Sequence, residues 1–276
     1  MANNNRIFIT GGASGLGKAI AIHYAKLGFN IAIGDISTEN LAATQAELAQ
    51  FNTEILTFHC DTRSEQSLID VRNNLQEQWG GIDILVNNAG VAGTYGDVGQ
   101  VSLDDWQTVF DINLFGVVRG CKVFAESFKH QKSGAIVNIA SMAGLLTPPN
   151  AAGYNASKAA VVALSETVRY EMTPFGVSVH AVCPAFFKTN LTQSMKSNPK
   201  AKAFVDREME KSSVTASDVA HMIEQQIRSN NFLLLTHKKE RRLWQLKRFF
   251  PSVYQNLVAK AFAKINKKQI QSQQPL

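Results

Sequence analysis

The chain has 276 residues, of which 45% are hydrophobic and 18% are charged, a composition that supports a substantial apolar core and excludes a chain that is disordered throughout. No apolar run approaches the ~20 residues that span a bilayer, and the N-terminus lacks the pattern of a secretory signal peptide, so we expect a cytoplasmic protein. The net charge is +6, but residues 237–276 contain ten lysine or arginine residues and one glutamate, which leaves a mildly acidic body and a strongly basic C-terminal segment.

Short apolar runs alternate with longer helical patterns from residue 6 to about residue 236. The strands are expected at residues 6–10, 30–35, 54–60, 82–87, 135–139, 177–183 and 232–235. The helices between them are expected at residues 16–27, 38–50, 64–79, 103–129, 151–175 and 217–229. This alternation predicts an α/β fold in which residues 1–236 form a single domain, a doubly wound seven-stranded parallel sheet with helices on both faces.

Two stretches depart from this alternation. Residues 185–214 form a connection of about 30 residues where ~2 to 6 are usual, so we expect a lid. Residues 237–276 form a basic extension, and the stretch that follows Pro251 has the pattern of an amphipathic helix with separate apolar and lysine stripes. Such a helix suits an anionic membrane surface, with residues 241–268 as the contact. Packing on the body or on a second subunit, or docking of an acidic carrier protein, would also explain it, whereas no motif indicates a nucleic-acid partner.

The cysteines and histidines give no metal-ligand spacing. Cys60, Cys121 and Cys183 lie far apart, and the six histidines are scattered along the chain. We therefore expect free thiols and no metal site.

A glycine-rich turn follows the first strand and opens into a helix. Its sequence, TGGASGLG over residues 10–17, lets backbone amides approach a pyrophosphate at the positive end of that helix. Asp35 ends the second strand at the offset where an acid meets an adenosine ribose, and its charge repels a 2′-phosphate. NAD(H) is therefore expected in preference to NADP(H), which is not excluded. A tight turn with an ordinary capping aspartate is the alternative. The expected cofactor contacts of this region are Gly11, Ser14, Gly15, Leu16, Gly17 and Asp35.

Tyr154 and Lys158 are placed at i and i+4 near the start of a predicted helix, and so on one face of it. A neighbouring ammonium lowers the pKa of a phenol, as acid–base catalysis by tyrosine requires. Ser141 lies just beyond the fifth predicted strand, at the sheet edge where ligands bind in such folds. Taken alone, Tyr154 and Lys158 would be explained more simply as two exposed residues of a helix.

Together with Asp61, Asn113 and the segment Asn87-Asn88-Ala89-Gly90, these motifs resemble the short-chain dehydrogenase/reductase family of Rossmann-fold enzymes, in order and spacing over residues 6–236. The resemblance implies the strand order 3-2-1-4-5-6-7, an NAD(P)-dependent oxidoreductase acting on CH–OH groups, and a homodimer or homotetramer. It also implies that Tyr154 exchanges a proton with the substrate oxygen and that Ser141 holds that oxygen.

The resemblance implies further roles for single residues. Lys158 would lower the pKa of Tyr154 and bind the nicotinamide ribose, and Asn113 would position a water. Cofactor contacts are implied for Asp61, Asn88, Ala89, Gly90, Tyr154, Lys158 and Thr189. Ala185 stands where the family usually has glycine, which would cost roughly 1 kcal/mol if the backbone there were left-handed.

The residues expected to line a substrate pocket are mostly large and apolar: Tyr95, Phe186, Phe187, Leu191 and Met195, with Phe204. They favour a hydrophobic substrate, although several could merely pack the lid onto the body. We expect hydride transfer between NAD(H) and a hydrophobic secondary alcohol or ketone, such as a lipid-, steroid- or retinoid-like molecule. The alternatives are a 3-oxoacyl carrier-protein reductase that uses NADPH and, from another class, a non-catalytic dinucleotide-sensing or scaffold protein.

Overall fold

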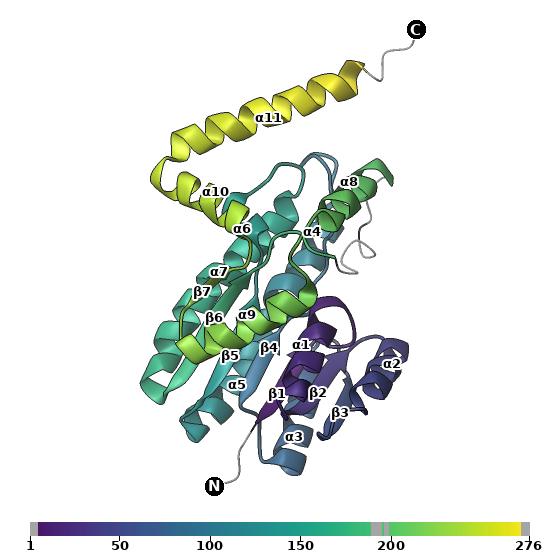
Figure 1. Cartoon of the computed structure of the whole chain (residues 1–276), viewed down its shortest axis with the longest axis vertical. Coiled ribbons are helices and arrows are strands. Elements are labelled where there is room, and N and C mark those ends of the chain that lie inside the picture. The colour runs from purple at the N-terminus through teal and green to yellow at the C-terminus, as the bar shows by residue number, and fades with distance from the viewer. Residues whose placement is uncertain (1–4, 189–194, 196–198, 272–276) are drawn as a thin grey trace.

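The computed structural model describes residues 5–188, 195 and 199–271. All seven strands pair in parallel in one sheet, in the order β3-β2-β1-β4-β5-β6-β7 (Figure 1). The strands are β1 (Arg6–Thr10), β2 (Asn30–Asp35), β3 (Ile55–His59), β4 (Ile84–Asn87), β5 (Gly134–Ile139), β6 (Val177–Cys183) and β7 (Leu233–Leu235). The expected fold class and strand order are confirmed.

Helices cover both faces of this sheet. Successive side chains of a strand point to opposite faces, so Ile7 and Ile9 of β1 lie in one hydrophobic cluster and Phe8 lies in the other. The first cluster is closed by α1, α2 and α9, and the second by α3, α5 and α7. The helices are α1 (Gly15–Lys26), α2 (Thr38–Leu48), α3 (Glu65–Trp79), α4 (Leu103–Phe110), α5 (Gly116–Gln131), α6 (Met142–Leu146), α7 (Ala152–Met172), α8 (Pro199–Glu210), α9 (Ala216–Ser229), α10 (Lys238–Phe249) and α11 (Pro251–Gln271), with the short turns η1 (Asp111–Phe115) and η2 (Thr173–Phe175).

The single helix expected over residues 103–129 is interrupted. The π-helical turn η1 separates α4 from α5, and Asn113 lies in that turn, fully buried. Its amide pairs with the backbone of Val91, accepting from the N–H at 2.8 Å and donating to the carbonyl at 2.9 Å. A π turn admits one more residue than an α-helical turn, and such turns are frequent at functional sites. The apolar pattern of the sequence could not reveal this π turn, because such a pattern indicates which face of a helix is buried and not the type of turn.

The lid and the basic extension also contain regular structure. Helix α8 lies within the expected lid of residues 185–214, and α10 and α11 make up most of the extension, with the break at Pro251 where the sequence indicates it. Figure 1 shows α10 against the end of the body near α6 and α11 projecting away from the sheet. Within the described part of the chain, none of the helices combines the length and the apolar character needed to cross a membrane.

The packing of α5 on β4 generates a stability prediction. A Cβ atom on Gly120 would collide with the side-chain oxygen of Asn87. Asn87 is 2% exposed, and its amide nitrogen donates to the side-chain oxygen of Asn138 at 2.8 Å. Overpacking of this kind costs ~1 to 3 kcal/mol, more than the gain of up to ~1 kcal/mol from replacing a helical glycine. We expect Gly120→Ala to lower the urea midpoint of unfolding. Gly99→Ala, in an exposed loop where only Asp97 comes near, is the control and should change stability by less than ~0.5 kcal/mol.

Candidate active site

The glycine-rich turn after β1 is held in a shape that side chains would block. Gly11 and Gly15 have φ angles of 61° and 51°, in the left-handed region that favours glycine. A Cβ atom on Gly17 would collide with the carbonyl oxygen of Gly11. Asn88, after β4, donates from its amide to the carbonyls of Thr10 and Gly11 at 3.0 and 2.9 Å. The turn is therefore a fixed cradle that brings backbone close to whatever binds there.

The N-terminus of α1 is open to an anion. Ser14 occupies the N-cap position but makes no capping hydrogen bond, and the first turn contains no acidic residue. By contrast, Ser37 caps α2 by accepting from the N–H of Asn40 at 3.2 Å. The amides of the first turn of α1 and the positive end of its dipole suit the pyrophosphate of a dinucleotide.

Asp35 lies beside this cradle at the end of β2. Its carboxylate accepts hydrogen bonds from the N–H of Ala13 at 3.2 Å and of Ser37 at 3.1 Å, which fix it at the edge of the turn. An ionised carboxylate has further lone pairs, so ribose hydroxyls could bind the same group. Lys18, the nearby cation on α1, is ion-paired with Glu47. The local charge therefore suits an unphosphorylated ribose.

Asp61 follows β3 on the same edge and is engaged by its neighbour. The guanidinium of Arg63 donates to it at 2.6 Å, and this hydrogen bond holds the pKa of Asp61 below its usual value. A cofactor contact through Asp61 would have to share the carboxylate with Arg63.

Ser141 and Tyr154 meet beyond the end of β5. Ser141 caps α6 by accepting from the N–H of Ala143 at 3.1 Å, and its hydroxyl also contacts the carbonyl of Pro184 at 3.4 Å. Tyr154, in the first turn of α7, lies near enough to Ser141 for the serine hydroxyl to lower the pKa of the phenol. The sequence-predicted pair of hydroxyl groups is thus brought together by two helices that start side by side.

Lys158 lies one turn further along α7 and is buried. Its Nζ donates to the carbonyl of Ile139 at 2.8 Å and lies 5.9 Å from the centre of the Tyr154 ring. Burial lowers the pKa of Lys158 to about 8, because an ammonium ion loses solvation there.

The expected lowering of the Tyr154 pKa is not found. Burial raises the pKa of Tyr154 because the phenolate would be desolvated, and the hydrogen bond from Ser141 opposes the rise without cancelling it. At neutral pH the phenol therefore keeps its proton, which it could donate to a carbonyl oxygen.

Asn113 and Gly90 complete the described surroundings of Lys158. A Cβ atom on Gly90 would lie 3.1 Å from the side-chain oxygen of Asn113 and 3.4 Å from Nζ of Lys158, so this glycine lies close to both groups. Asn113 also donates to the hydroxyl of Ser157 on α7 at 3.3 Å. It therefore ties the loop after β4 to the helix that carries Tyr154 and Lys158.

The residues expected to line the substrate pocket differ in their burial and in their neighbours. Tyr95 and Phe204 of α8 face each other with ring centres 6.4 Å apart, and Phe186 is 45% exposed. Phe187 is buried in the cluster between the sheet and α1 and α9, a position that favours packing over substrate contact. Met195 is half-buried, whereas Leu191, like the expected cofactor contact Thr189, lies outside the described residues.

The strain considered for Ala185 is absent. Among the described residues other than glycine, a positive φ occurs only at Lys132, Thr147, Asn150 and Asn230. The backbone of Ala185 therefore accommodates a side chain.

Sequence reasoning missed two residues of the site. Thr10 accepts from the N–H groups of Asn88 and Ala89 at 3.0 and 3.2 Å, and so joins the ends of β1 and β4. Trp106 of α4 lies against Gly153 in a small pocket that borders Tyr154. The threonine before the glycine turn was a usable signal, whereas nothing in the local pattern distinguished Trp106 from a core aromatic.

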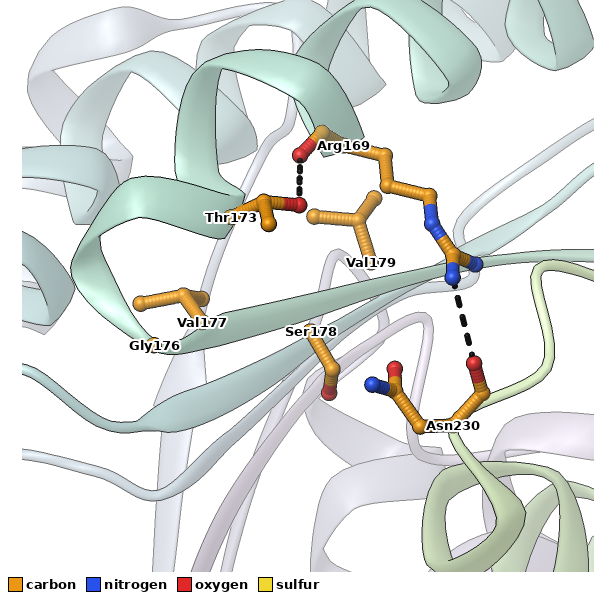
Figure 2. A pocket seen from close by; sticks show the side chains of 7 residues that line it. All are labelled: Arg169, Thr173, Gly176, Val177, Ser178, Val179 and Asn230. Carbon is orange, nitrogen blue, oxygen red and sulfur yellow. Dashed lines mark hydrogen bonds between the residues drawn. The ribbon is translucent and has the colours of Figure 1, made fainter.

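A larger pocket of about 180 Å³ lies elsewhere, at the opposite edge of the sheet (Figure 2). Arg169 crosses it and donates to the carbonyl of Asn230 at 3.2 Å. The volume is below the ~300 to 1,000 Å³ of typical ligand pockets, and no expected site residue lines it.

Comparison with known proteins agrees with this geometry. A family model described as short chain dehydrogenase matches residues 5–200. A 3-oxoacyl-[acyl-carrier-protein] reductase of Synechocystis sp. is 33% identical over 192 residues, which cover 69% of this chain and 77% of the relative. A 3beta-hydroxysteroid dehydrogenase of Mediterraneibacter gnavus is 33% identical over 196 residues, which cover 71% of each protein.

A solved structure resembles the whole fold. The crystal structure of a short chain dehydrogenase/reductase from Burkholderia phymatum in complex with NAD has a TM-score of 0.85 and 31% identity, with 91% of this chain and 95% of that chain covered. The glycine cradle, the open N-terminus of α1 and Asp35 fit an NAD(P) cofactor on their own geometry. The chain belongs to the short chain dehydrogenase family and is an NAD(P)-dependent oxidoreductase that acts on hydroxyl or keto groups.

Proposed function

We propose that the protein is a cytoplasmic oxidoreductase that uses NAD(H) and acts on a hydrophobic secondary alcohol or ketone of lipid-, steroid- or retinoid-like character. The observation that carries the proposal is that the hydroxyl groups of Ser141 and Tyr154 are neighbours beside the buried Lys158, at the sheet edge that also holds the glycine cradle.

Each polar group has a distinct task in this proposal. A bound nicotinamide supplies or accepts the hydride. In the direction of reduction, Tyr154 donates its proton to the carbonyl oxygen, while the hydroxyl of Ser141 binds the same oxygen. The phenolate left on Tyr154 is stabilised by the positive charge of Lys158, whose Nζ lies 5.9 Å from the centre of the ring. Asn113 holds the loop after β4 against α7 and positions a water that connects Lys158 with solvent.

The cofactor is held by groups that already face the cradle. Amides of Ser14–Gly17 receive the pyrophosphate, Asp35 binds the ribose hydroxyls, and the segment 88–90 lines the path toward Lys158, which binds the second ribose. Asp61 and Thr189 are further proposed contacts. The anchored carboxylate of Asp35 and the ion pair of Lys18 with Glu47 support NAD(H) over NADP(H).

An apolar substrate is supported by the side chains around Tyr154. Trp106 borders it directly, and Tyr95, Phe186 and Phe204 lie on the segments that flank the site. A 3-oxoacyl carrier-protein reductase is the second candidate, because exposed basic residues of α10 such as Arg241 and Arg242 would suit an acidic carrier. We also propose a homodimer or homotetramer built on the helices of residues 103–129 and 151–175, in which Phe115 is an exposed apolar side chain.

A substrate panel tests the activity. NADH and NADPH oxidation would be followed by absorbance with a steroid ketone, a long-chain aldehyde, a 3-oxoacyl thioester and a small polar ketone. Fast turnover of the apolar ketones with NADH supports the proposal, and a preference for the thioester with NADPH supports the second candidate. Tight NADH binding without turnover of any compound would instead indicate a non-catalytic, dinucleotide-sensing protein.

Removal of the phenolic oxygen tests the catalytic assignment. Tyr154→Phe should lower kcat by roughly 100-fold or more, since the proton donor is lost, while the Kd for NADH stays within about twofold. Tyr170→Phe, at an exposed position of α7, is the matched control and should leave kcat unchanged. Near-normal turnover by Tyr154→Phe would refute the assignment.

Neutralisation of the ribose acid tests the cofactor preference. Asp35→Asn keeps the size of the side chain but weakens the hydrogen bonds to the ribose and removes the repulsion of a 2′-phosphate. The ratio of kcat/KM for NADH to that for NADPH should fall by about tenfold or more. Asp70→Asn, an exposed acid on α3, should leave the ratio unchanged; a ratio unaffected by the Asp35 variant would contradict the role.

We further propose that the outer face of α10 and α11 binds an anionic membrane surface, as expected for residues 241–268. Apolar side chains gather where the two helices meet, and exposed basic residues lie on both sides of them. The apolar group is Phe249, Phe250, Val253 and Leu257, and the basic residues are Arg241, Arg242, Arg248, Lys260 and Lys264. Helices of this kind bind membranes by inserting their apolar side chains, while the anionic lipid headgroups attract their basic side chains.

Vesicle sedimentation tests this surface. The double variant Phe249→Asp/Phe250→Asp should bind phosphatidylglycerol-containing vesicles at least about tenfold more weakly, because each buried phenylalanine contributes ~1.5 to 3 kcal/mol. Phe175→Asp, an exposed aromatic at the opposite edge of the sheet, should bind like the wild type. Equal binding of the wild type to purely zwitterionic vesicles would contradict the electrostatic part.

A further inference from the structure

The inner face of the basic extension bonds to the short helix α6. Nζ of Lys247 donates to the carbonyl of Leu145 at 2.7 Å and to the hydroxyl of Thr147 at 3.0 Å. The hydroxyl of Tyr254, on α11, donates to the carbonyl of Leu146 at 2.7 Å. Two side chains more than 100 residues away in sequence thus bind the C-terminal end of α6.

Helix α6 depends on such partners. It contains five residues, Met142–Leu146, and a helix of that length has little stability of its own. The last carbonyls of any helix lack partners within the helix, and a cation near that end also interacts favourably with the helix dipole. Lys247 and Tyr254 supply the missing donors, and Lys247 supplies the cation.

The contacts with the carbonyls of α6 are partly buried. Tyr254 is 7% exposed, and Trp244 of α10 packs against the hydrophobic cluster that contains Met142 of α6. Burial lowers the pKa of Lys247, whose Nζ also lies 5.8 Å from the centre of the Tyr254 ring. These contacts order the side chains at the junction between the basic extension and α6.

The other end of α6 carries Ser141. Its hydroxyl caps the helix at the N–H of Ala143 and lies near Tyr154, and the N–H of Met142 donates to the carbonyl of Pro184 at 2.8 Å. Because α6 spans little more than one turn, fraying at one end reaches the other. Misplacement of a catalytic group by ~1 Å can reduce turnover by about 100-fold.

We propose that the basic extension positions Ser141: Lys247 and Tyr254 hold the C-terminal end of α6 so that its N-cap hydroxyl keeps its place beside Tyr154. The two are positioning residues that touch neither substrate nor cofactor. This inference rests on the proposed function of the Ser141–Tyr154 pair, and its structural half can be tested without turnover.

Kinetics of single and double variants of the full chain test the catalytic half. Lys247→Met with Tyr254→Phe should lower kcat by about tenfold, with KM and the Kd for NADH within about twofold, since only placement of Ser141 changes. Lys247→Arg keeps a donor and a charge and should retain most of the activity. Lys26→Met on α1 and Lys239→Met on α10, both at exposed positions, are the matched controls.

The pH profile separates positioning from a general loss of structure. The Ser141 hydrogen bond lowers the pKa of Tyr154, while burial and the charge of a Cys183 thiolate raise it, and Lys158 is the neighbouring cation. Loosening of Ser141 therefore raises the pKa of Tyr154. In alcohol oxidation, which needs the phenolate, the rising limb of the rate profile of the double variant should move to higher pH.

Hydrogen exchange gives the readout that needs no substrate. The amides of Ala143, Gly144 and Thr147, which bond within or at the ends of α6, should exchange at least about tenfold faster in the double variant than in the controls. Wild-type protein that turns over no compound would defeat the proposed function and leave this readout intact. The positioning role would be overturned if the double variant changed neither the amide exchange rates of α6 nor kcat. It would also be overturned if the fall in kcat were matched by equal losses of NADH affinity and of the free energy of unfolding, since that would indicate a general loss of structure.

Discussion

The placement of the Ser141 hydroxyl beside Tyr154 is the constraint on which the rest of the candidate site depends. Ser141 is placed by the end of β5 and by α6, and Tyr154 by α7. Helix α7 is in turn fixed through Lys158, which bonds to the end of β5, and through Ser157, which bonds to Asn113 in the π turn. A small set of buried polar bonds thus determines where two hydroxyl groups meet.

Burial gives this site its electrostatic character. The same enclosure raises the pKa of Tyr154 and lowers the pKa of Lys158, because each charged form loses solvation. The phenol therefore keeps its proton at neutral pH, and the lysine lies near its own titration range. Among the groups that act on the phenol, the neighbouring Ser141 hydroxyl is the one that opposes the rise in its pKa.

The sequence was sufficient for the sheet and for the family, since strand periodicity and motif spacing are local properties. It was insufficient where tertiary contacts decide. The π turn at Asn113 depends on a bond to Val91, and the direction of the Tyr154 pKa shift depends on burial by residues distant in the sequence. Phe187 has the same local character as Phe186, and only the fold places one in the core and leaves the other exposed. No helical pattern in the sequence predicts the hydrogen bonds of Lys247 and Tyr254 to α6.

The contact between the extension and α6 bears on how relatives of this chain diverge. The match to the family covers residues 5–200, so Lys247 and Tyr254 lie outside the region by which such proteins are recognised. Two enzymes with identical catalytic motifs could then evolve different turnover rates through changes in their last forty or so residues alone. Trimming of that segment to aid crystallisation, or a fusion partner attached to it, would alter the chemistry while every motif stayed in place.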